Sequence, residues 1–134
     1  MITIKENAFK KIELDPGSSI FMYHWKATTG EMTVDQFMAE SMDLLDTYLQ
    51  HGTRSVLAVD FDFRFPIEPE LQTQANALLL SKLNGTNLRK FAHVISGELI
   101  TQLSVEQLFE ENEAKTYADR YFEDREAALD WCRR

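Results

Sequence analysis

Cysteine is nearly absent from this sequence, and its scarcity excludes several kinds of protein. Cys132 is the only one, so the chain can form no internal disulfide and no zinc site built from several cysteines. A reducing compartment, the cytoplasm, is therefore expected. No apolar run approaches the ~20 residues that a membrane-spanning helix needs. Residues 1–7 lack the apolar region of a signal peptide.

Basic residues are also few. The 14 Lys and Arg residues face 22 Asp and Glu residues, which gives a formal net charge of −8. Such a balance repels a phosphate backbone, so DNA and RNA are excluded as partners. Only three prolines and five glycines interrupt the chain, and no repeat divides it. The 134 residues, 44% of them hydrophobic, suffice for one domain with its own core.

Several stretches have the composition of β-strands. Turn-forming residues at 15–18 separate an apolar stretch at 9–14 from an aromatic-rich stretch at 20–25, which predicts an antiparallel hairpin. Residues 2–4 form a further short extended piece. Apolar runs predict three more strands, at residues 55–60, 88–95 and 117–122.

Helices are predicted between these strands. Thr33 and Gln36 have the spacing of a capping box, and Gly52 ends the helix that they begin. Further helices are expected from residues 68–70, from 98 with a restart at Ser104, and after Asp124. The order β-β-α-β-α-β-α-β-α predicts a single α/β domain with a mixed sheet of four to five strands.

Three parts of the chain resemble the SpoIIAA-like superfamily, which includes STAS domains and anti-sigma-factor antagonists. They are the hairpin that ends at residues 23–26, the central strand 56–60 with its following loop and helix, and the closing strand and helix at 120–131. The resemblance spans nearly the whole chain and is closest to small stand-alone bacterial proteins of unassigned activity. It implies a SpoIIAA-like fold and a role in binding, because relatives include protein-interaction modules and lipid-transfer domains of the CRAL-TRIO class are structurally related.

The phosphorylation motif of the regulated antagonists is missing. Those relatives carry Asp-Ser-(Ser/Thr)-Gly at the start of the helix after the central strand. Residues 60–70 contain no Ser, Thr or Gly here. The phospho-switch therefore does not carry over to this sequence.

Polar residues gather at the predicted carboxyl ends of two neighbouring strands, where open α/β sheets bind their ligands. Asp60, Asp62 and Arg64 follow one strand, and Ser96 and Glu98 follow the next. They are candidates for binding a polar ligand or for acid–base chemistry. The alternative is structural: Asp60 caps backbone groups, while Asp62 and Arg64 pair at the surface.

Phe61, Phe63 and Phe65 alternate with the polar residues of the first segment. An extended backbone would place all three rings on one side. The rings then form an aromatic wall for an apolar ligand, the seam of a homodimer, or part of the core beneath the flanking helices. A homodimer with these rings at its interface is expected.

Signatures of enzymes, metals and cofactors are absent. His24, His51 and His93 lack metal-ligand spacing, and the sequence contains no nucleophile elbow, P-loop, dinucleotide fingerprint or C-x-x-C pair. We therefore expect a non-catalytic cytoplasmic domain that binds another protein or an apolar small molecule, with no metal and no cofactor. The alternative is a small hydrolase-like enzyme that uses Asp60, Asp62, Arg64 and His93.

Overall fold

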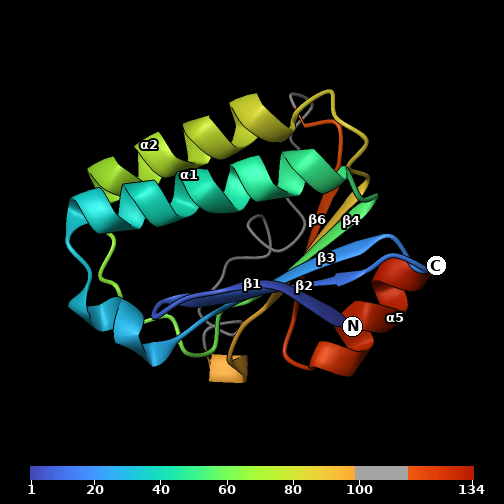
Figure 1. Ribbon diagram of the computed structural model, residues 1–134, viewed down its shortest axis with the longest axis horizontal. Helices are drawn as coiled ribbons and strands as arrows, with labels where there is room; N and C mark the ends of the chain where they lie inside the picture. Colours follow the sequence, from blue (N-terminus) through green and yellow to red (C-terminus); the bar gives the residue numbers. More distant parts are fainter. Residues whose placement is uncertain (99–114) are drawn as a thin grey trace.

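A six-stranded sheet organises the computed structural model, which describes residues 1–98 and 115–134 (Figure 1). The strands lie side by side in chain order: β1 (Ile2–Glu6), β2 (Lys10–Asp15), β3 (Ile20–Trp25), β4 (Ser55–Val59), β5 (Lys90–Val94) and β6 (Ala118–Phe122). Strands β1 to β3 are antiparallel, and β3 to β6 are parallel. The predicted α/β class and mixed sheet are confirmed.

The sheet contains one strand more than predicted. Residues 2–6 pair along β2, from Ile2 opposite Leu14 to Glu6 opposite Lys11, with an irregularity between Thr3 and Lys5. Four of the five residues of β1 are exposed. Because this edge strand buries so little, its sequence carries only a weak alternation of apolar and polar residues.

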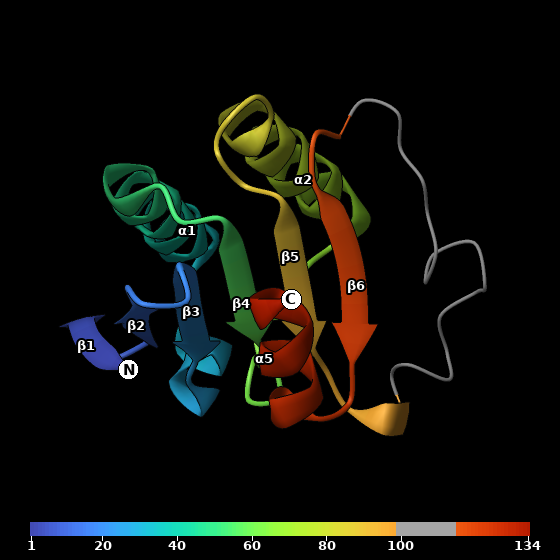
Figure 2. The same cartoon turned by 90° about the vertical axis from the view of Figure 1, so that its right-hand side faces the viewer.

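Helices cover both faces of the sheet (Figures 1 and 2). The short 3₁₀-helix η1 (Ala27–Glu31) leads into α1 (Val34–His51), and α1 and α2 (Pro69–Leu83) lie side by side on one face. The last helix, α5 (Arg125–Arg133), packs against β4, β5 and β6 on the other face. Right-handed crossovers that advance one strand at a time place α1 and α2 on the same face.

The predicted helix ends agree with the structure. The Thr33 hydroxyl accepts a hydrogen bond from the Gln36 amide at 3.1 Å, and the Gln36 side chain bonds back to the Thr33 amide. Gly52 ends α1 in the left-handed region, with φ of 58°. The helix predicted from residue 98 with its restart at Ser104 lies almost entirely outside the described residues. No helix within residues 1–98 and 115–134 is long and apolar enough to cross a membrane.

Alternation along the strands divides the core into two clusters. Phe21, Val56 and Phe91 point toward α1 and α2 and belong to the larger cluster. Leu57 and Val94 point toward α5, where they join Leu129 in the smaller one. The face toward α1 and α2 carries the larger side chains and contains the candidate site.

Candidate functional site

A cavity of about 410 Å³ lies between the sheet and the pair of helices α1 and α2. Apolar side chains make up most of its wall, among them Phe21, Val56 and Phe91 from the sheet and Phe37, Leu45 and Leu79 from the helices. On α2, Leu83 is buried, whereas Leu71, Ala75, Leu78 and Leu79 are only partly buried. Ala75, Leu78 and Leu79 line the cavity, so their apolar surfaces are not fully covered by other side chains.

Asp60 stands at one end of this cavity. It comes directly after β4 and shares its face with Val56 and Ala58 because side chains alternate along a strand. Its backbone amide donates to the Val94 carbonyl at 3.0 Å, but no donor within residues 1–98 and 115–134 hydrogen-bonds its carboxylate. Burial raises the pKa of the Asp60 carboxyl, and the nearby imidazoles of His93 and His24 offset this only in part.

A second, shallower hollow of about 310 Å³ adjoins the cavity at the carboxyl edge of the sheet. Asp60, Phe63 and Ile95 line both spaces, so Asp60 lies between the interior and the surface. The hollow is lined by most of the site residues that the sequence predicts, namely Asp60, Phe61, Phe63, Arg64, Ser96 and Glu98. The structure therefore brings together six of the residues that were predicted from the strand ends.

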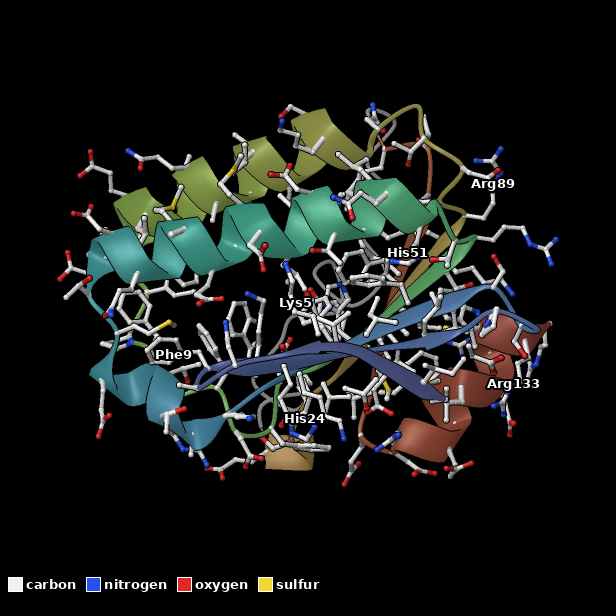
Figure 3. All side chains as sticks on the ribbon, viewed as in Figure 1. Lys5, Phe9, His24, His51, Arg89 and Arg133 are labelled. Carbon is white, nitrogen blue, oxygen red and sulfur yellow. The ribbon has the colours of Figure 1, made fainter. Side chains whose placement is uncertain are left out.

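Asp62 lies outside this hollow. Its carboxylate is half-exposed and accepts a hydrogen bond from Nε2 of His24 at 3.3 Å, while Arg64 Nη2 is 3.9 Å away. Figure 3 places His24 on the side of the sheet away from α1 and α2. The surface pairing of Asp62 with Arg64, which the sequence left as one alternative, is present.

The three phenylalanines do not share one side, which corrects the expectation of an extended segment. The backbone turns directly after β4, where the Phe63 amide donates to the Asp60 carbonyl at 3.2 Å. Phe61 is 40% exposed, whereas Phe65 is buried and stacks on Phe37 at 4.9 Å between ring centroids. The Phe63 ring packs against Trp25 at 5.6 Å. The homodimer stays a prediction, and Phe61 is the most exposed of the three rings.

His93 belongs to a polar group that the sequence analysis missed. Its Nε2 lies 2.9 Å from Oδ1 of Asp119, and Lys115 pairs with the other oxygen of that carboxylate. The imidazole is stacked between the rings of Phe91 and Tyr121, at 4.5 and 4.7 Å. The signal was the pairing of β5 with β6: Phe91 lies opposite Asp119 and His93 opposite Tyr121, so all four side chains share a face.

The two partly buried carboxylates of this face have pKa values shifted in opposite directions. Burial alone would raise the pKa of Asp119, but the hydrogen bonds and charges of His93 and Lys115 outweigh it and hold that pKa below its usual value. Asp60 has no such partner among residues 1–98 and 115–134. Tyr23, which also lines the cavity, has a pKa well above the usual phenol value because of burial and the negative charges of Asp60 and Asp119. Its phenol is therefore neutral at physiological pH.

No three His, Cys, Asp or Glu side chains come together as a metal site in the part of the chain that the structure describes. Cys132 of α5 is buried against the sheet, and burial raises the pKa of its thiol.

No protein-family model, curated protein or solved structure matches the chain.

Proposed function

We propose that the protein is a binding domain that takes an apolar small molecule into the cavity between the sheet and helices α1 and α2. The cavity itself carries this proposal, because about 410 Å³ falls within the ~300–1,000 Å³ typical of small-molecule sites. A mostly apolar wall with a few polar groups at one end is also typical of such sites.

A small ligand is favoured over a protein partner. The large hydrophobic side chains exposed among the described residues are Met1, Ile2, Val34, Leu49 and Phe61. They come from the first two residues, from both ends of α1 and from the loop after β4, so they are separated along the chain. Binding surfaces for proteins are usually contiguous apolar patches. The apolar surface most available for binding therefore lies inside the cavity.

Binding is also favoured over the hydrolase-like alternative. Asp62 and Arg64 lie near each other, and Asp62 also bonds His24 at the surface. His93 directs Nε2 at Asp119, not at Asp60. Asp60 and His93 both line the cavity, but His93 bonds Asp119, and Asp62 lines neither the cavity nor the hollow.

We further propose that the domain is SpoIIAA-like and cytoplasmic. The element order supports the first part, since an antiparallel opening is followed by parallel strands with helical crossovers. The cavity adds a reason to compare it with the lipid-transfer relatives of that superfamily rather than with its phosphorylated antagonists.

The affinity of straight-chain alcohols tests the proposed binding function. Isothermal titration calorimetry with hexanol, octanol and decanol should show about a fourfold gain in affinity for each added methylene, the equivalent of ~0.8 kcal/mol, until the cavity is full. Absence of binding by all three alcohols would contradict the proposal.

A pair of matched variants locates the site. Ala75 lines the cavity, whereas Ala77 is exposed on the same helix. Ala75→Phe should weaken octanol binding at least tenfold because its ring occupies the cavity, and Ala77→Phe should leave the affinity unchanged. Both substitutions cost the same intrinsic helix propensity, so equal losses in the two variants would place the binding elsewhere.

A further inference from the structure

We infer that the ligand is an amphipathic amine, whose apolar body fills the cavity and whose protonated nitrogen lies beside Asp60. The inference rests on the proposed binding function and adds the chemical class of the ligand. It follows from the charges, the aromatic rings and the hydrogen bonds at the end of the cavity where Asp60 lies.

The charge of the wall is negative. Asp60 is the single carboxylate among the described lining residues, and none of them is Lys or Arg. An anionic ligand would place a second negative charge next to a partly desolvated carboxylate, which is unfavourable. A cationic head would instead supply the opposite charge that a buried carboxylate needs.

The described residues do not supply that charge. His93 and His24 are close enough to Asp60 to influence its pKa, but each has another carboxylate as its partner. His93 bonds Asp119, and His24 bonds Asp62 from the opposite face of the sheet. Lys115 is paired with Asp119, and Arg64, which lines the adjoining hollow, bonds the Phe61 carbonyl and lies 3.9 Å from Asp62. The Asp60 carboxylate is therefore left for a donor from outside the described chain.

Aromatic rings surround the same end of the cavity. His24 of β3 is paired with Val59 of β4. The next residues along the two parallel strands, Trp25 and Asp60, therefore lie beside each other. Trp25 packs edge-on against Tyr23 at 6.2 Å and lies tilted against Phe63 at 5.6 Å, and all three rings line the cavity. Aromatic faces attract ammonium groups, most strongly when these are desolvated. A carboxylate beside three rings is suited to an alkylammonium head.

Three ligands with the same eight-carbon chain test the inference by calorimetry at pH 7. Octylamine should bind at least tenfold more tightly than octanol, and octanoate should bind more weakly than either. In Asp60→Asn the advantage of the amine over the alcohol should fall to less than twofold, while octanol keeps its affinity. Asp62→Asn is the matched control, since this nearby carboxylate is half-exposed and outside the cavity. It should preserve the tenfold preference.

The outcomes separate the two proposals. Equal binding of the three ligands would overturn the amine inference and leave the binding function intact, whereas no binding by any of them would overturn both. Loss of the amine preference in Asp62→Asn as well would assign the preference to the general negative charge of the protein and would also overturn the inference. Thermal unfolding of each variant shows whether it is folded, and a folded Asp60→Asn that still prefers the amine tenfold contradicts the role of Asp60.

Discussion

Asp60 is held where its charge is unfavourable for folding. It has a carboxylate next to an apolar cavity, its pKa is raised by burial, and no described side chain donates a hydrogen bond to it. Asp119, on the same face of the sheet, has the lowered pKa of a carboxylate with two partners. A group that costs stability at a cavity wall is typical of a binding site.

Replacing Asp60 by Asn should stabilise the protein at neutral pH. When the pKa of a carboxyl is higher in the folded than in the unfolded protein, ionisation of that carboxyl destabilises the fold. The loss of stability develops as the pH rises from the unfolded-state pKa through the folded-state pKa. We expect Asp60→Asn to raise the free energy of unfolding at pH 7 by an amount on the order of 1 kcal/mol, and to have little effect near pH 3, where both side chains are neutral.

Urea unfolding at the two pH values measures this difference. Asp62→Asn should change the stability by less than about 0.5 kcal/mol at either pH, because its carboxylate is half-exposed. An Asp60→Asn variant that is less stable than the parent at pH 7 would contradict the unfavourable ionisation of Asp60.

The sequence predicted part of the site because strand ends are local features. Ser96 and Glu98 could be placed beside Asp60 once strands 55–60 and 88–95 were recognised as neighbours. The partnership of His93 with Asp119 needed the pairing of β5 with β6, which depends on long-range packing. The cavity depends on how far α1 and α2 stand from the sheet, and no residue pattern encodes that distance.

At the scale of elements, local signals were reliable where they were chemically specific. The capping box at Thr33 and the glycine at position 52 predicted both ends of α1, because caps satisfy particular backbone groups. The segment after β4 was misjudged. Alternation of Phe61, Phe63 and Phe65 fits a strand, but the bond between the Phe63 amide and the Asp60 carbonyl makes a turn.

Trp131 is expected to fix α5 to the sheet. Its half-buried ring packs against Phe122 at 5.7 Å and lies 5.2 Å from Nζ of Lys90, which also donates to the Trp131 carbonyl at 2.7 Å. Trp131→Ala should lower the free energy of unfolding by about 2–3 kcal/mol, somewhat less than the ~3–5 kcal/mol for a fully buried ring.

Denaturant unfolding of two further variants completes this test. Trp131→Phe should recover most of the loss, because a ring remains against Phe122. The exposed neighbour Asp130, replaced by Ala, should change stability by less than about 0.5 kcal/mol. If Trp131→Ala unfolded at the same denaturant concentration as the parent, the packing of α5 would not depend on this ring.

In the whole molecule, the two faces of the sheet differ in how completely they are filled. Small residues such as Ala92 and Ala128 allow α5 to pack directly on its face, with Leu57 and Val94 buried between them. On the other face two helices cover the wider cluster and leave the cavity. A ligand there would contact the sheet and both helices at once.

Such a ligand should stabilise the molecule as a unit, because unfolding either layer would destroy its site. At a free octanol concentration tenfold above the dissociation constant, the free energy of unfolding should rise by about 1.4 kcal/mol. For a chain of this length that is a rise in Tm of about 5 °C. Differential scanning calorimetry at several octanol concentrations measures it. The rise should be absent in Ala75→Phe and present in Ala77→Phe. Binding without any rise in Tm would mean that octanol also binds the unfolded chain or contacts only a surface that unfolding leaves intact.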